Sequence, residues 1–230
     1  MQTKEIIDHL SKLGKKFRSM EEELRSTYHF DDLRDVRINM FRHCRIVIDS
    51  TYLIMLVRDR HLFDNDWWKG LMARNLISRG MTGEQRSIFL YGFDTHILSS
   101  YLVMLLFTVE SAFRSFYPLK ISDKPPLSFK KLYEKFMPEF GLANYIELLK
   151  LASLTRNTLH NGSLYIWDND SVDWRGKTYS FEKGKRVDLG DAWSTLIIIT
   201  EDIHEMIQKL VKSDTILKQE EIIDASYDIA

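Results

Sequence analysis

The chain has 230 residues, a formal net charge of −1 and 44% apolar residues. This length suits one ordinary domain, and the apolar fraction is large enough for a packed core, which excludes a wholly disordered chain. A dedicated nucleic-acid binder usually carries a clear basic excess, because phosphate contacts supply most of its affinity. The near-neutral charge therefore limits any nucleic-acid contact to a local or a transient one.

The cysteine content and the lengths of the apolar runs bear on the compartment. Cys44 is the single cysteine, so no internal disulfide can form, which is typical of a reducing compartment. The longest apolar run, LVMLLFTV at 102–109, is far shorter than the roughly 20 residues that a membrane span needs. We expect a soluble, cytoplasmic protein that does not associate with membranes.

The first third of the chain predicts helices. Residues 2–26 carry apolar side chains at helical spacing opposite a charged face. A second long helix is expected to begin in FDDLRDVRINM, with Asp31 and Asp32 in its N-terminal turn, and to end near His61. A shorter helix is expected at about 67–78, before a break in SRGMTGEQ that two glycines mark.

The middle of the chain predicts the most buried helix, at about 93–117, ended by Pro118. A proline-marked linker and a short helix follow. Another helix is expected at about 142–160, stopping at Asn161-Gly162. These lengths and connections are typical of helices packed side by side.

The pattern then changes. Residues 163–187 are rich in aromatic and β-branched side chains and are punctuated by turn sequences, which predicts a β-hairpin insertion. A last helix with a regular apolar stripe is expected to start near Asp188 or Asp191. The tail at 213–230 is amphipathic but short, so a weak helix is the most that we expect there.

Together these elements predict a mainly α fold, namely an antiparallel helical bundle with a small β-hairpin inserted before the last helix. We divide the chain into an N-terminal helical extension packed on the bundle (1–89), a helical core (90–212) and the tail (213–230).

The sequence favours neither a metal nor a cofactor. None of the seven histidines forms an H-x-x-x-H pair, and the adjacent His43 and Cys44 would point about 100° apart on a helix. DNDSVDWRGKTY begins like a calcium loop but lacks the glycine at its sixth position and the glutamate at its twelfth. Glycine-rich phosphate loops and nucleophile elbows are missing from the sequence as well.

The segment RNTLHNG, at 156–162, has the most informative polar pattern. Basic residues in the last turn of a helix complement its dipole, and Asn or Gly just beyond the end takes a capping conformation. On these rules Arg156, His160 and Asn161-Gly162 form an ordinary helix C-terminus.

The direction of Arg156 weighs against that interpretation. The apolar stripe of its helix consists of Tyr145, Leu149, Ala152 and Leu159. At 100° per residue Arg156 lies in the middle of this stripe and His160 at its edge. A buried guanidinium needs a partner, and Glu110, the only acid in the interior of the most apolar helix, is the natural candidate for an ion pair. Such a pair would leave His160 unexplained.

A helical bundle with Arg-Asn and His near the end of a late core helix resembles the HEPN superfamily, whose ribonuclease members carry an Arg, a polar residue, a short spacer and a His. RNTLHNG, followed by a hairpin-like insert and a final helix, looks most like the plasmid- and phage-defence-associated branch over about 90–212. The spacer between Arg156 and His160 is three residues, shorter than is usual in the family, but this i, i+4 spacing still places both on one helix face.

The resemblance implies metal-independent cleavage of RNA, at a site assembled across a homodimer, in phage defence or a toxin–antitoxin stress response. His160 would be the general base on a ribose 2′-hydroxyl or the acid on the 5′-oxygen. Arg156 would hold the phosphate, and Asn157 would orient the His or the phosphate, with Glu110 and Asn161 in support. A two-fold pairing would supply a second His160.

The resemblance further implies RNA as the substrate and an antitoxin or defence protein as another partner. The near-neutral charge and the short spacer favour an alternative, a non-catalytic HEPN-like module that binds a nucleotide or a protein. A third interpretation is purely structural, with Arg156 paired to Glu110 and His160 capping its helix.

Overall fold

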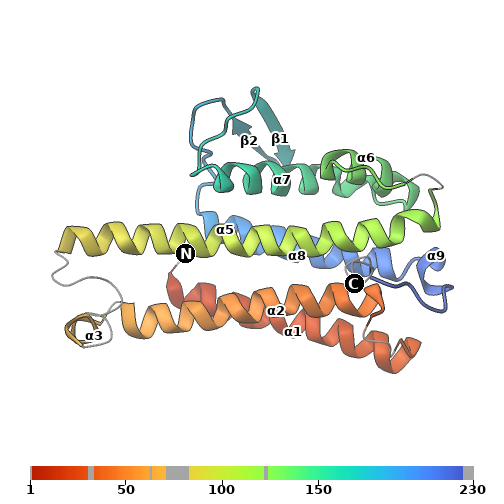
Figure 1. Cartoon of the computed structure of the whole chain (residues 1–230), viewed down its shortest axis with the longest axis horizontal. Coiled ribbons are helices and arrows are strands. Elements are labelled where there is room, and N and C mark those ends of the chain that lie inside the picture. The colour runs from red at the N-terminus through yellow and green to blue at the C-terminus, as the bar shows by residue number, and fades with distance from the viewer. Residues whose placement is uncertain (1, 31–33, 63, 71–82, 122–123, 225–230) are drawn as a thin grey trace.

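The computed structural model of the chain describes residues 2–30, 34–62, 64–70, 83–121 and 124–224. Its long helices are stacked in layers (Figure 1). The lowest layer in this view pairs α1 (Thr3–Tyr28) with α2 (Val36–Val57). The middle layer holds α5 (Gly83–Phe116) and α8 (Ala192–Val211), with α2 packed on α5 and α1 on α8. This is the mainly helical bundle that the sequence predicts.

The upper layer carries the segment singled out above. It consists of α6 (Phe129–Glu139) and α7 (Ile146–His160), and α7 packs on both α5 and α8. The shorter elements are a π-helical turn at Arg58–Leu62, α3 (Asn65–Lys69), 3-10 turns at Tyr117–Leu119 and Ala143–Tyr145, and α9 (Asp214–Leu217).

The second helix starts later than the sequence indicates. It begins at Val36, because the Asp35 side chain accepts a hydrogen bond from the Arg37 backbone N–H at 2.9 Å and so caps the helix. Asp31 and Asp32 lie outside the described residues. The π-helical turn carries the helix on to Leu62, close to the predicted end. Of the helix predicted at 67–78, α3 covers the beginning, and the part after residue 70 lies outside the described residues.

The longest helix, α5, begins at Gly83 rather than near residue 93. Its first turns project beyond the bundle and are mostly exposed (Figure 1). Their apolar residues, at 88–91, follow one another without a helical period, so no stripe marks the start of the helix. It ends at Phe116, just before Pro118, as predicted. The boundary drawn between residues 89 and 90 falls inside this helix.

Among the described residues, one helical stretch, Gly83–Leu119, is long and apolar enough to cross a membrane by length and composition. Half of its most apolar window is buried inside the bundle, and core helices of soluble proteins pass the same criterion.

The predicted insertion is a two-stranded antiparallel hairpin of β1 (Asp170–Trp174) and β2 (Lys177–Phe181). Its two-residue turn, Arg175-Gly176, has φ of 49° and 73°, the left-handed backbone that tight hairpins require. Alternate side chains of both strands are buried, namely Val172, Trp174, Tyr179 and Phe181. This apolar face packs the hairpin on α7, as Figure 1 shows.

Candidate functional site

The end of α7 is a well-formed helix terminus. The helix stops at His160, and Asn161 caps it by donating from its side-chain amide to the backbone carbonyl of Asn157 at 2.7 Å. Gly162 and Ser163 follow with φ of 66° and 68°. The predicted stop at Asn161-Gly162 is confirmed, with Asn161 acting through its side chain and Gly162 through its backbone.

Arg156 points from α7 towards α5 and α6. Its Nη1 lies 3.7 Å from a carboxylate oxygen of Glu110, so the predicted pair is present. The guanidinium also lies 5.7 Å above the ring of Phe129. The Arg156 side chain is 23% exposed and that of Glu110 21%, so this pair lies at a partly open surface and not in the core.

Glu110 serves two arginines, and the second one is bound more tightly. Arg114 donates to its carboxylate at 2.6 Å and to the backbone carbonyls of Pro126 and Leu127 at 2.7 and 2.8 Å. Two guanidiniums therefore share one carboxylate, which leaves a formal charge of +1. Such a cluster suits an anion of phosphate geometry.

Asn157 acts on the arginine. Its side-chain oxygen accepts from both Nε and Nη2 of Arg156, each at 3.2 Å, and so fixes the plane of the guanidinium. The sequence left open whether Asn157 orients the histidine or the phosphate. In the structure its carbonyl oxygen orients the arginine that would hold the phosphate.

His160 is exposed and lines an open pocket of about 550 Å³ between α5 and the end of α7, called here the His160 pocket. From α5 this pocket receives a second imidazole, His96, and the hydroxyls of Ser99 and Ser100. Sequence reasoning missed His96, which lies 64 residues before His160 in the chain. Its exposed position on a strongly apolar helix was the only signal that marked it.

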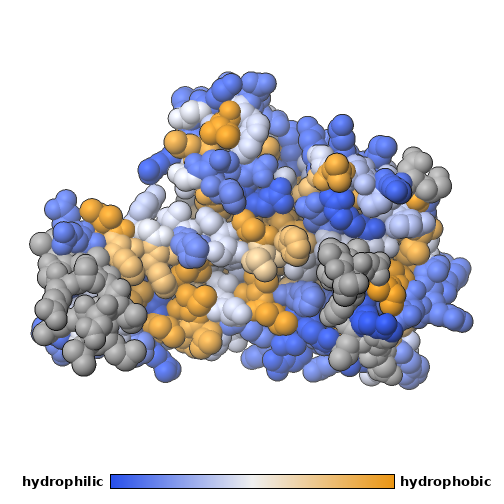
Figure 2. Space-filling view, viewed as in Figure 1, coloured by the Kyte–Doolittle hydropathy of each residue, from blue (hydrophilic) through white to orange (hydrophobic). Residues whose placement is uncertain are grey.

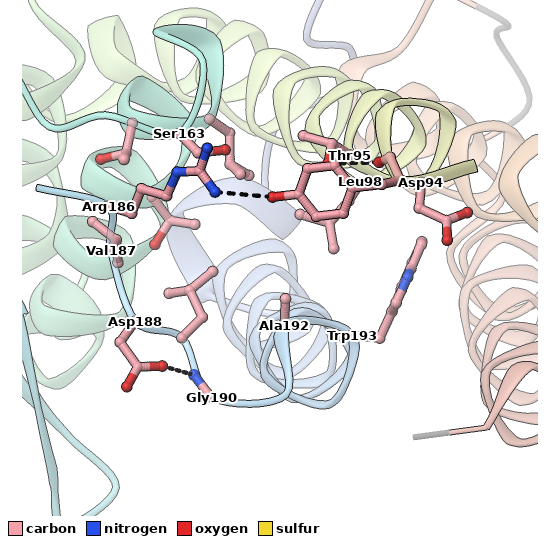
Figure 3. A pocket seen from close by; sticks show the side chains of 15 residues that line it. Asp94, Thr95, Leu98, Ser163, Arg186, Val187, Asp188, Gly190, Ala192 and Trp193 are labelled. Atoms are coloured by element: carbon pink, nitrogen blue, oxygen red, sulfur yellow. Dashed lines mark hydrogen bonds between the residues drawn. The ribbon is translucent and has the colours of Figure 1, made fainter. Parts of the chain in front are cut away.

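A second cavity adjoins the His160 pocket and is called here the Arg186 cavity. Its volume is about 330 Å³, and its walls come from α5, the end of α7, residues 186–190 and the first turn of α8. Thr95 and Leu159 line both spaces, so the two are neighbours. Figure 3 shows Arg186 and Trp193 on opposite sides of the Arg186 cavity.

The charged groups of the Arg186 cavity are mostly engaged in the structure. Asp94 pairs through both oxygens with Arg58. Asp188 accepts from the backbone N–H of Gly190 at 2.7 Å, and Arg186 lies 3.4 Å from the hydroxyl of Tyr91 (Figure 3). Arg186 is exposed, and its hydrogen bond to the Tyr91 hydroxyl is long, so its guanidinium is the group best placed to receive an anion.

Within the described part of the chain, no group of three or more His, Cys, Asp or Glu side chains is arranged to hold a metal ion. Cys44 is fully buried, and burial raises the pKa of its thiol far above the usual range. It is therefore a core residue of α2 and no part of the site.

Comparison with known proteins yields no relative. The chain matches no family model, no curated protein and no solved structure. The fold and the site define the class on their own: a helical bundle that presents Arg156, Asn157 and His160 at the open end of one core helix, beside a second cavity.

Proposed function

We propose that the protein is a metal-independent endoribonuclease of HEPN type, with its site formed across a homodimer. The observation that supports this best is the contrast along α7. Arg156 is held by Asn157 and Glu110, while His160, one turn later, stands exposed in an open pocket. An oriented cation and, one helical turn further along, an accessible imidazole are the two kinds of group that cleavage of a phosphodiester requires, although Arg156 itself does not line the His160 pocket.

The reaction needs these side chains and one further imidazole. His160 takes the proton from a ribose 2′-hydroxyl, and the 2′-oxygen attacks the neighbouring phosphorus. The bond to the 5′-oxygen breaks, leaving a 2′,3′-cyclic phosphate and a 5′-hydroxyl. Arg156 stabilises the charge that develops on the phosphate, and a second imidazole protonates the leaving 5′-oxygen.

The reaction needs an imidazole besides His160, and this is the reason for proposing a dimer, in which the partner's His160 would supply it. An apolar groove of about 550 Å³ runs between α2 and α5 and is called here the α2–α5 groove. It shares His96, Ser100 and Met104 with the His160 pocket. In Figure 2 hydrophobic side chains gather over this part of α2 and α5. A two-fold contact through the groove would bring the two His160 pockets towards each other.

The test is cleavage of RNA by the purified protein in EDTA, comparing wild type with His160→Ala and Arg156→Lys. We expect both variants to lose activity by about 100-fold or more, since general acid–base catalysis typically contributes that much and lysine cannot reproduce the guanidinium fork. His9→Ala, on α1 and outside both pockets, is the matched histidine control. Mass spectrometry of the products should find cyclic phosphate ends.

Cleavage that is equal in all four proteins, or missing from the wild type, would refute the assignment. In a cell the activity would belong to phage defence or a toxin–antitoxin system in the cytoplasm, with an antitoxin or defence protein as partner. Slowed growth on expression of wild type, and not of His160→Ala, would support that setting.

One observation favours the alternative of a non-catalytic HEPN-like binding module. The Arg156 guanidinium already contacts Glu110 and Asn157, so it has partners without any ligand. For such a module, His160→Ala would leave RNA or partner binding unchanged, and the wild type would bind RNA without cutting it.

A further inference from the structure

We propose that the Arg186 cavity binds one nucleotide of a single RNA strand, with the base against Trp193 and Tyr91 and the phosphodiester at Arg186. This deepens the proposed function and rests on it, because the nucleotide would be the neighbour of the one that is cut. Binding of this nucleotide can be measured separately from cleavage.

Size and lining point to a small planar ligand. The volume of about 330 Å³ lies within the range of about 300–1,000 Å³ that is usual for small-molecule sites. Two aromatic side chains line the cavity, Tyr91 from α5 and Trp193 from α8. Tyr91 is 60% exposed, so its ring face is available, and nucleobases of any kind stack on such faces.

The polar groups suit a base joined to a phosphodiester. Arg186 is exposed at one side of the cavity, opposite Trp193 (Figure 3). Asp188 is exposed close by, so a ligand with a single negative charge is favoured over one with two. A phosphodiester carries one charge, whereas a terminal phosphate monoester carries about −1.5 to −2 at pH 7.

One buried hydroxyl in the wall has no use in the fold. Thr155 is only 1% exposed, and its Oγ1 has no hydrogen-bond partner among the described residues. The neighbouring Thr158 differs, because its hydroxyl donates to the carbonyl of Leu154 at 2.8 Å. A buried polar group without a partner is costly, and this hydroxyl is closed off from the cavity, so Thr155 contributes to the wall through its other atoms.

The position of the cavity connects it to the His160 pocket. Thr95 and Leu159 form the shared wall, so a strand that places one phosphate near His160 can place its next nucleotide beyond Leu159. The residues of the Arg186 cavity would then determine which nucleotide flanks the cut.

The test is calorimetric titration of the full chain with 2′-O-methyl dinucleotides, whose blocked 2′-oxygen prevents cleavage. We expect one binding event per chain. Trp193→Leu should bind about tenfold more weakly because it loses a stacking surface. Arg186→Ala should bind about tenfold more weakly and with less dependence on salt, since one phosphate contact is lost. Lys185→Ala, which pairs with Glu182 and lies outside the cavity, is the matched control.

Thr155→Val is a control within the wall of the cavity. It removes the partnerless, inaccessible hydroxyl at nearly constant volume, so the melting temperature should stay unchanged or rise and dinucleotide binding should stay at the wild-type level. If Trp193→Leu fails to fold, Tyr91→Ala replaces it, because Tyr91 is mostly exposed. Equal binding of inorganic phosphate or of indole by the wild type, or unchanged binding in the Trp193, Tyr91 and Arg186 variants, would overturn the proposal.

The two proposals fail in different ways. If dinucleotides bind as expected and the wild type cuts no RNA, the nucleotide site stands and the ribonuclease assignment falls. If RNA is cut in a His160-dependent manner and the Arg186 and Trp193 variants bind dinucleotides like wild type, the ribonuclease assignment stands and the nucleotide site falls.

Discussion

Arg156 and Arg114 share Glu110, and their contacts predict different effects on stability. Arg156→Ala should change the free energy of unfolding by less than about 1 kcal/mol, because the pair with Glu110 is partly exposed and Arg114 remains to neutralise the carboxylate. Arg114→Ala should cost more, since it loses two carbonyl contacts as well. Urea unfolding of both variants measures the difference.

This comparison also bears on function. If Arg156 serves only the fold, its removal should lower the free energy of unfolding by a few kcal/mol. If Arg156→Ala destabilises the protein by several kcal/mol and Arg114→Ala does not, the arginine serves the fold and the phosphate role loses its support.

His204 should make the stability of the protein sensitive to mild acid. Its ring lies edge-on to Phe17 at 4.7 Å, and its buried Nε2 has no hydrogen-bond partner within the described ranges. Burial lowers the pKa of His204 below its usual value. The unfolded chain therefore binds the proton more readily than the folded one. As a result, His204 costs no free energy of unfolding above about pH 6.5, and the free energy of unfolding falls as the pH drops below that value.

Thermal melts at pH 7.5 and 5.5 measure this effect. The melting temperature should fall by about 2–4 °C for each kcal/mol lost, and His204→Leu should flatten the dependence in this window. Carboxylates with a lowered pKa, such as Glu205, change the stability only at more acidic pH, because they take up a proton near or below about pH 4.5. An unchanged slope in His204→Leu would show that another group titrates here.

At the scale of elements, the start of α2 holds the C-terminal segment in place. Arg37 is fully buried, pairs with Asp35, and donates to the backbone carbonyls of Ile216, Gln219 and Glu220 at 2.8–3.1 Å. The backbone N–H of Val36 also donates to the carbonyl of Ile222. These contacts order a tail that its own sequence would leave as a weak helix.

Arg37→Met should therefore lower the free energy of unfolding by about 3–5 kcal/mol, because a buried Asp35 loses its partner. Chemical denaturation gives the value, and proteolysis should cut first within 213–224. Arg34→Met is the control: Arg34 pairs with Glu221 at an exposed surface, so its loss should cost less than about 1 kcal/mol. Similar costs for the two variants would exclude this function of Arg37.

The elements that the sequence located well are those with a local rule. Burial alternates along the hairpin and its turn needs left-handed backbone at Gly176, so 163–187 was recognisable. The start of α5 follows no such rule, since its first turns leave the core and lose their apolar period. The Arg37 contacts were hidden as well, because they join residues nearly 180 positions apart.

The residues of the site likewise fall into those that a local rule locates and those that only the folded structure brings together. The helical period fixes the direction of a side chain. The spacing of 100° per residue placed Arg156 on the apolar stripe, and its contact with Glu110 follows from that direction. Arg186 lies in the segment before α8 and Tyr91 lies in α5, 95 positions earlier in the chain. Only the packing of the whole molecule brings them to one cavity. Spacing in the sequence holds no information of that kind.

At the scale of the whole molecule, the exposed face of α2 and α5 predicts self-association. Its apolar side chains are from 40% to 62% exposed, and they are Ile46, Leu53, Ile54, Val57, Met104 and Phe107. Monomers rarely expose a large contiguous apolar patch (Figure 2). We therefore expect a homodimer at micromolar concentration, measured by analytical ultracentrifugation.

Leu53→Lys combined with Ile46→Lys should give a folded monomer, because both positions are exposed in a single chain, line the α2–α5 groove and not the His160 pocket, and charge is costly in an apolar interface. Leu127→Lys is the control: Leu127 is 95% exposed in the segment before α6, away from the groove, and its change should leave the dimer intact. The monomer keeps Arg156 and His160 but loses the second His160. It should therefore cut RNA far more slowly than the Leu127→Lys dimer, and equal rates would place the whole site, with His96 as the second imidazole, in one protomer.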